Sequence, residues 1–481
     1  MSPRFSEHFG LKKTQAELDF VDIELERDFP LFVDPYAISI TPGEWHARCA
    51  DVIVSFFSEL IGKIVSKNEL GAQQMLEHLQ EANDTRFGLS SGKPRGRGIG
   101  QGYSDRLYRQ FTSSKAAVSG QLSDISDCEL MIEGIGPDRI SDMTINIIRY
   151  ELIKYTQAQC SFWNIPMSMV PSGPCWNKES SDWINLYVNL PVYEYSRILL
   201  VPKSIVRFRG IINHMEYYEK FVLNYLEAEH LRANSSLVAV LKNGRRKVYK
   251  RDLKEQMPPK KDNIANFVGG HPETLNNYKL RVASQDRMLG PERIESLHDT
   301  PRPIEPMGMA ADLTNIEPGA AGANRFHLLI ESILSYVFYE DLMNPVKEER
   351  IHDGRKRVDI YYDNCCKDGF FKALWQLHGI KCPYLVVECK NYSEDVANPE
   401  FDQLSGRFSE SRGKVGLLIC RSIDDKASCL KRCRDTYLDN RGVIIVLEDK
   451  DIVALLEKRY KHTKEQVDAY MSRKLRDIII G

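Results

Sequence analysis

The stretch Tyr384–Lys390, YLVVECK, constrains the fold more than any other part of the chain. Its apolar, β-favouring residues predict a buried strand, yet Glu388 and Lys390 stand at the end of it. Side chains alternate along a strand, so these two leave one face while Val387 and Cys389 pack on the other. Charges near the interior of a sheet are costly unless they are paired or bound to a metal. The end of this strand is therefore a candidate site.

The elements around this strand predict an α/β domain. Asp353-Gly354 between two extended runs indicates a hairpin over 344–364. Asn398 is the expected N-cap of a helix that carries Pro399 at its first position. The resulting order predicts a mixed sheet flanked by helices on both faces. The further expected helices are 324–338, 425–438 and 449–460, and the further expected strands are 414–422 and 442–447.

A second carboxylate is expected beside the first. Val358 and Ile360 bracket Asp359 on the hairpin strand, so Asp359 points away from them and can meet Glu388 if the strands are neighbours. Two adjacent carboxylates repel each other, and a hard divalent ion such as Mg²⁺ relieves that repulsion. Lys390 would then orient or deprotonate a metal-bound water. This set suits phosphodiester hydrolysis. The alternative is a surface salt bridge without chemistry.

The same residues resemble a known family. An acidic residue that closes a hairpin strand, followed by Glu-x-Lys at the end of the next strand, is the signature of the PD-(D/E)xK nuclease superfamily, which has the restriction-endonuclease-like fold. The matching residues here are Asp359 and Glu388-Cys389-Lys390, with Val358 in the place of the signature proline. The likeness extends to Glu331 on the preceding helix. It also reaches Gln403 in FDQLSGRF, which is similar to the Gln-bearing helix of the Mrr-like branch.

The resemblance implies a Mg²⁺-dependent endonuclease, with Mn²⁺ as a substitute ion. It makes Asp359, Glu388, Lys390 and Gln403 catalytic, and Asp359, Glu388 and Glu331 metal ligands. Glu331 has the alternative of a solvated helix residue. Gln403, with Arg407 one turn further, has the alternative of an exposed polar stripe.

The rest of the chain divides by composition. Prolines and glycines over 285–322 predict a linker between a larger α+β N-terminal region, 1–284, and the nuclease domain, 323–481. The expected N-terminal helices are 44–82, 143–160 and 213–232, and the expected strands are 128–135, 183–192 and 196–206. We expect the N-terminal region to recognise substrate, to sense or to gate.

The net charge of −2 requires no polyanionic partner, so nucleic-acid contacts must be local. Basic residues cluster in 90–106, a glycine-rich loop, and in 242–261. Phosphate contact competes there with a simple solvated loop or hairpin. The predicted nucleic-acid-binding residues are Arg95, Arg97, Arg245, Arg246, Lys247, Lys250 and Arg251.

The start of the chain has no apolar signal core and no run reaches membrane-spanning length, so we expect a cytoplasmic protein without a membrane partner. The 11 cysteines are scattered as buried thiols would be, and no spacing completes a zinc site. The expected partner is DNA, with RNA left open, and the expected assembly is a homo-oligomer, a dimer or higher. The resemblance suggests prokaryotic restriction or anti-phage defence. The rivals are a repair or recombination nuclease and an inactive nuclease fold used as a nucleic-acid-binding module.

Overall fold

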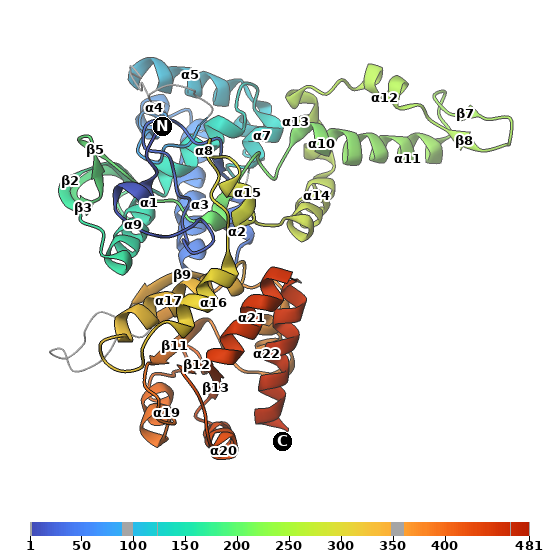
Figure 1. Cartoon of the computed structure of the whole chain (residues 1–481). Coiled ribbons are helices and arrows are strands. Elements are labelled where there is room, and N and C mark those ends of the chain that lie inside the picture. Colours follow the sequence, from blue (N-terminus) through green and yellow to red (C-terminus); the bar gives the residue numbers. More distant parts are fainter. Residues whose placement is uncertain (1, 89–99, 123, 348–359, 462, 481) are drawn as a thin grey trace.

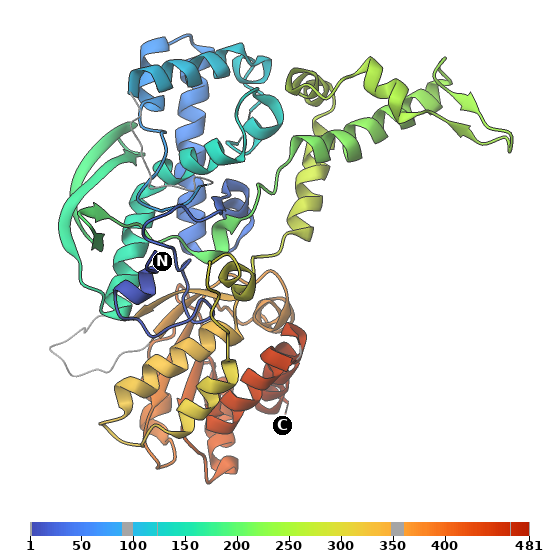
Figure 2. The same ribbon diagram turned by 45° about the horizontal axis from the view of Figure 1, so that its top comes forward.

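The computed structural model of the chain describes residues 2–88, 100–122, 124–347, 360–461 and 463–480. It consists of a mainly helical N-terminal body, an arm that extends from it, and a C-terminal domain built on a sheet (Figures 1 and 2). The elements of the body are α1 (Phe5–His8), β1 (Phe32–Val33), α2 (Pro35–Ile40), α3 (Glu44–Val65), α4 (Glu69–Leu76), α5 (Gly100–Ser113), α6 (Lys115–Val118), α7 (Asp127–Met131), α8 (Pro137–Ile147), α9 (Arg149–Trp163), β2 (Ser168–Asn177), β3 (Asp182–Leu190), β4 (Val192–Tyr193), β5 (Ser196–Arg197) and β6 (Val206–Arg207).

The body confirms some expected elements and corrects others. The helix expected over 44–82 is two helices, α3 and α4, and the helix expected over 143–160 falls across α8 and α9. Strand β3 confirms the strand expected over 183–192, whereas most of 196–206 is not strand. The strand expected over 128–135 is wrong, because its first residues form α7. Cys128, Leu130, Met131 and Ile132 are all buried, and a short apolar run buried on every side does not distinguish strand from helix.

Residues 214–285 form the arm, whose outer part extends away from the body in both views, while α13 (Lys261–Gly270) packs against α6 and α7 (Figures 1 and 2). A helical stretch runs outward through α10 (His214–Tyr217), a π-helical turn of the same stretch (Tyr218–Val222) and α11 (Leu223–Ala233), close to the helix expected over 213–232. Asn234 takes a left-handed conformation with φ 47° and ends α11. The chain then turns at its far end and returns through β7 (Ala239–Val240), β8 (Arg246–Lys247), α12 (Lys250–Gln256), α13 (Lys261–Gly270) and α14 (Pro272–Gln285).

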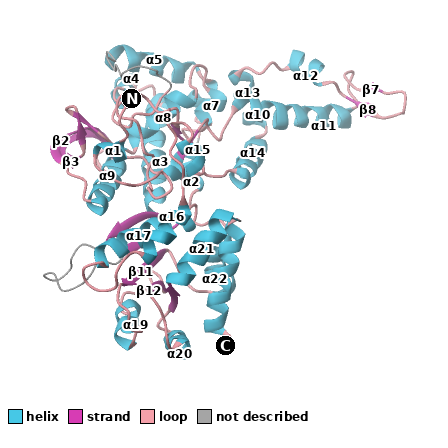
Figure 3. Cartoon of the chain, in the orientation of Figure 1, coloured by secondary structure: helices cyan, strands magenta, loops and turns pink. Residues whose placement is uncertain are grey.

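The C-terminal domain holds a five-stranded mixed sheet in the order β13-β12-β11-β10-β9. Strand β10 runs antiparallel to β9 and β11, whereas β11, β12 and β13 are parallel. The strands of this sheet, magenta in Figure 3, lie in the lower part of the molecule among the helices of the domain. The mixed sheet expected from the sequence is confirmed. The elements are α17 (Ala323–Val337), β9 (Leu342–Lys347), β10 (Ile360–Asn364), α18 (Gly369–His378), β11 (Tyr384–Lys390), α19 (Asn398–Ser405), β12 (Val415–Cys420), α20 (Lys426–Leu438), β13 (Val443–Glu448), α21 (Asp449–Lys461) and α22 (Lys464–Ile479).

Helices cover both faces of this sheet. Tyr362 lies opposite Leu385, and its hydroxyl donates to the carbonyl of Glu331, so α17 covers that face. Gly416 lies opposite Val386 on the other face, where a Cβ would come within 3.0 Å of Leu404 on α19. Alternation along β11 therefore turns Glu388 and Lys390 toward α19 and away from α17.

The segment 285–322, expected to be a linker, contains α15 (Pro291–Glu295) and α16 (Pro306–Thr314). Helix α16 packs against α17 and α21 of the C-terminal domain. The N-terminal body also contacts this domain directly: Lys347 on β9 donates to the carbonyl of Phe162 at 2.9 Å, and Lys13 donates to Ser332 at 2.5 Å. Strand β9 is the last strand of the sheet, and α9 packs against it. The body thus protects a sheet edge that would otherwise be open.

Candidate active site

Glu388 and Lys390 form a buried ion pair at the end of β11. Lys390 Nζ lies 2.6 Å from Glu388 Oε1, and the side chains of Lys390 and Glu388 are 10% and 2% exposed. The ammonium also donates to Oε1 of Gln403 on α19 at 3.2 Å. Three of the predicted site residues are therefore brought together, from a strand and from the helix that follows it.

Arg407 adds a second cation to this cluster. Its guanidinium reaches to 4.0 Å from Glu388 Oε2, and its side chain is only 10% exposed. Arg407 comes two residues after the end of α19, where its N–H donates to the carbonyl of Leu404. The sequence analysis noted that Arg407 follows Gln403 by one helical turn but gave Arg407 no role.

The oxygen Glu388 Oε2 accepts no hydrogen bond from any described residue although it is buried. A buried carboxylate oxygen without a donor is costly, and a divalent cation relieves that cost directly. Glu388 and the amide oxygen of Gln403 are oxygen donors of the type that Mg²⁺ prefers. Within the described ranges no group of three His, Cys, Asp or Glu side chains forms a metal site, so these residues fit part of a metal site and not a complete one.

Asp359, the second predicted carboxylate, lies outside the described residues. Description of β10 begins at Ile360, which pairs with Val387, the neighbour of Glu388. The roles of Asp359 in catalysis and metal binding therefore stay predictions. Arg95 and Arg97 also lie outside the described residues.

Glu331 is not brought to Glu388 by any described contact. It lies on α17, over the opposite face of the sheet, and is 1% exposed. Its Oε1 accepts from Ser335 at 2.9 Å, and Lys13 and Lys347 are the cations that act on it. Burial raises the pKa of the Glu331 carboxyl to about 8. Its contacts thus place Glu331 where the N-terminal body meets the C-terminal domain.

Replacing Glu331 by glutamine is expected to stabilise the protein at pH 8 and to change its stability little at pH 5. The folded pKa of about 8 is raised above the ordinary 4.5, so between these values the folded state keeps a proton that the unfolded state loses. Stability therefore falls as the pH rises through this window. Glutamine imitates the protonated carboxyl and should recover on the order of 3 kcal/mol at pH 8.

Urea unfolding of both proteins at pH 5 and pH 8 measures this difference. Glu292→Gln, at an exposed position, is the matched control. Equal stability of wild type and Glu331→Gln at both pH values would contradict the buried protonated carboxyl. The cleavage rate of the same variant tests the predicted metal role independently.

Three residues that the sequence analysis did not single out follow the parallel strands directly. Asn391, Arg421 and Asp449 come after β11, β12 and β13, at the carboxyl ends where functional residues gather in parallel sheets. Arg421 bonds Asp449 at 2.8 Å and Asn391 Oδ1 at 2.8 Å. It also donates to the carbonyls of Ile316 at 2.6 Å and Leu313 at 3.1 Å. The sequence signal that could have identified Asn391, Arg421 and Asp449 was their position directly after the three parallel strands.

Asn391 completes this network beside the candidate site. Its Nδ2 donates to the carbonyls of Glu317 and Gly319 at 3.0 and 2.9 Å. Since Asn391 directly follows Lys390, the end of the 285–322 segment is fixed to the residue next to the candidate catalytic lysine. We call residues 313–319, together with Asn391, Arg421 and Asp449, the strand-end network.

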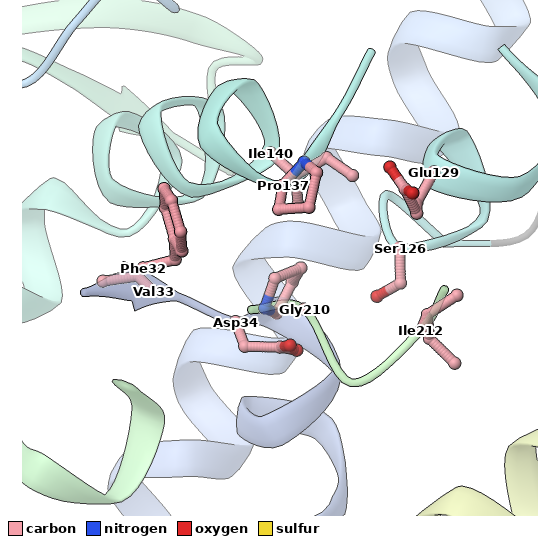
Figure 4. Close-up of a pocket in the computed structure, with 10 residues that line it drawn as sticks. Phe32, Val33, Asp34, Ser126, Glu129, Pro137, Ile140, Gly210 and Ile212 are labelled. Atoms are coloured by element: carbon pink, nitrogen blue, oxygen red, sulfur yellow. The ribbon is translucent and has the colours of Figure 1, made fainter. Parts of the chain in front are cut away.

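Two pockets of the structure lie apart from Glu388 and Lys390 and are lined by other residues. The pocket in Figure 4 is lined by the labelled residues of the N-terminal region, with Phe32 and Val33 on one side and Ser126, Glu129 and Ile212 on the other. It encloses about 20 Å³, which suits a water molecule and not a substrate. A second pocket, of about 200 Å³, is lined by Cys429 and Cys433, whose mutual hydrogen bond lowers the pKa of the Cys429 thiol.

Comparisons with known proteins bear on the N-terminal body alone. Residues 10–213 match a domain of unknown function, DUF8370. The match ends where the arm begins, so the arm and the C-terminal domain lie outside it. No curated protein and no solved structure matches the chain. In the part of the chain that the structure describes, no helix is both long and apolar enough to span a membrane.

Proposed function

We propose that this protein is a metal-dependent nuclease that hydrolyses phosphodiester bonds in DNA through its C-terminal domain. The observation that carries the proposal is the buried Glu388–Lys390 pair at the end of β11, with Glu388 Oε2 left without a hydrogen-bond donor among the described residues. The antiparallel β9–β10–β11 followed by parallel β12 and β13 supports a restriction-endonuclease-like arrangement of the PD-(D/E)xK type.

Each residue has a separate part in the proposed reaction. Lys390 orients the attacking water and stabilises negative charge that develops on the phosphate. Gln403 holds the lysine through its hydrogen bond, and Arg407 provides further positive charge beside Glu388. Glu388 and Asp359 would hold Mg²⁺, or Mn²⁺ in its place, which supplies a Lewis acid for the phosphate and activates water.

The N-terminal region is proposed to recognise substrate or to gate the nuclease, in a cytoplasmic homo-oligomer that serves prokaryotic restriction or anti-phage defence. Support for gating comes from the strand-end network, which fixes 313–319 to the residue after Lys390. A repair or recombination nuclease would use the same chemistry. An inactive nucleic-acid-binding module would not need a buried ion pair whose carboxylate oxygen lacks a hydrogen-bond donor among the described residues.

The deciding experiment is digestion of labelled duplex DNA, single-stranded DNA and RNA by the purified full-length chain, with Mg²⁺, with Mn²⁺ and with a chelator. We expect metal-dependent cleavage of DNA that the chelator abolishes. Binding without cleavage under all these conditions would favour the inactive module. Cleavage confined to RNA would refute the assignment of DNA.

Gln403→Ala should lower the cleavage rate about tenfold without unfolding the domain, since it removes one neutral hydrogen bond to Lys390. The residue is partly exposed, so its loss leaves little cavity. Single-turnover cleavage and a thermal melt are the two measurements. Gln403→Glu is the informative companion, because it keeps an acceptor for the ammonium. A lower melting temperature with unchanged cleavage would assign Gln403 to structure alone.

A further inference from the structure

The strongest concentration of positive charge lies at the outer end of the arm. Residues 242–251 hold six Lys and Arg and no Asp or Glu, in a chain whose net charge is −2. The outer end comprises β7, β8 and the start of α12, at the greatest extension of the arm in both views (Figures 1 and 2). We call residues 239–251 the arm tip. The charge therefore stands clear of the body.

The arm tip is a two-stranded hairpin. Ala239 pairs with Lys247 and Val240 with Arg246, and Gly244, at φ 78°, allows the tight turn between the strands. Its base is anchored by Val248, which is 1% exposed, whereas residues 242–247 are exposed. The hairpin thus presents a folded ribbon with cations along it.

Little of this charge is neutralised locally. Arg251 pairs with Asp252 at 3.2 Å, and Lys254 pairs with Glu219. Among the described residues, Lys242 and Arg245 at the turn form no ion pair with an acidic side chain. Lys247 lies 5.2 Å from the ring centre of Tyr249, and the ring is itself partly open to solvent. An exposed, uncompensated cationic ribbon favours a polyanionic partner.

We propose that the arm tip inserts into the major groove of double-stranded DNA while its lysines and arginines neutralise the flanking phosphates. The major groove of B-form DNA admits a two-stranded β-ribbon, whereas that of A-form RNA is too deep and narrow for side chains to enter. The scarcity of acidic residues on the tip fits phosphate on both sides of the groove. The choice of DNA rests on the proposed nuclease function, but binding itself does not require cleavage.

The test is equilibrium binding of the full-length chain carrying Lys390→Ala, so that no substrate is cut. Fluorescence anisotropy with a duplex DNA of about 30 base pairs is recorded over a salt series, without divalent ions. The tip variant replaces five exposed cations by glutamine, and a control variant replaces five exposed cations of the body. The tip positions are Arg245, Arg246, Lys247, Lys250 and Arg251, and the control positions are Lys67, Arg109, Lys115, Lys154 and Lys178.

The expected result is a loss of affinity of tenfold or more in the tip variant. The slope of log affinity against log salt should also become shallower, by about 0.9 for each phosphate that the tip no longer neutralises. The control variant, with the same change in net charge, should bind like its parent. A second variant, Lys242→Gln with Arg245→Gln, alters the turn alone and should show a smaller loss in the same direction. Far-ultraviolet circular dichroism checks that each variant folds.

Three outcomes overturn the proposal. The first is equal binding by the tip and control variants. The second is RNA duplex or single-stranded DNA bound as tightly as DNA duplex. The third is tip-dependent binding to an acidic protein or an anionic vesicle but not to DNA. If tip-dependent duplex binding is found while the digestion assay finds no cleavage, the nuclease assignment fails and the arm assignment stands.

Discussion

We expect Lys390→Ala to lower the rate of DNA cleavage by about a thousandfold, while divalent-ion binding is largely retained. Lys390 Nζ lies 2.6 Å from Glu388 and 3.2 Å from Gln403, and its side chain is only 10% exposed. In the proposed mechanism, its removal takes away the charge beside the reacting phosphate but none of the carboxylate ligands. Single-turnover cleavage and calorimetric titration with Mn²⁺ measure the two effects separately.

Lys431→Ala, at an exposed position on α20 of the same domain, is the matched control and should cut at the wild-type rate. Glu388→Gln and Asp359→Asn should abolish cleavage and weaken ion binding together, since each removes a charged ligand. Lys390→Ala cutting as fast as wild type would refute the proposed site. If Lys390→Ala loses both cleavage and folding, Lys390→Met separates the two effects, because methionine keeps the aliphatic volume of lysine without its charge.

The part of the site that the sequence predicted is the part that depends on local geometry. Glu388 and Lys390 share a face because side chains alternate along any strand, whatever packs around it. Gln403 follows on the next helix, and a short connection returns that helix to the same strand. The mixed sheet was predictable for the same reason, since each parallel strand has an apolar core and is followed by a helix with its own periodic stripe.

The position of Glu331 could not be predicted locally. Its helix was expected and is present, but the face that a helix residue occupies depends on how the helix docks. The contact with Ser335 lies within the same helix, whereas docking of the helix places Glu331 under the influence of the cations Lys13 and Lys347. Lys13 belongs to the N-terminal body, and local sequence patterns do not predict how that body packs against the C-terminal domain.

Two helices of the C-terminal domain were missed although both carried a signal. Helix α22 buries Val467, Met471, Leu475 and Ile478, which recur at helical spacing. Its many charged residues hid that stripe. Helix α18 carries cap signals, Asp368 before its first residue and Gly379 after its last, but it has only 10 residues. The charge of the first segment and the shortness of the second made each helix hard to predict from the sequence.

The strand-end network shows how function could depend on residues outside the recognised motif. Arg421 makes four hydrogen bonds, to Asp449, Asn391 and the carbonyls of Leu313 and Ile316. We expect Arg421→Ala to destabilise the protein by about 3 kcal/mol, because one buried cation leaves several acceptors unsatisfied at once. Burial already raises the pKa of Asp449, and loss of the guanidinium should raise it further.

Arg421→Lys distinguishes the charge from the geometry, since lysine keeps the cation but cannot reach four acceptors arranged around a planar guanidinium. It should recover less than half of the lost stability in urea unfolding. Asp449→Asn combined with Arg421→Ala should cost less than the sum of the two single changes, because the carboxylate that Arg421 compensates is then gone. Additive effects would show that Arg421 and Asp449 do not act as a pair. If the cleavage rate of Arg421→Ala falls by more than its unfolded fraction explains, residues 313–319 act on Lys390 through Asn391. If the folded fraction of Arg421→Ala cuts at the wild-type rate, the network contributes to stability alone.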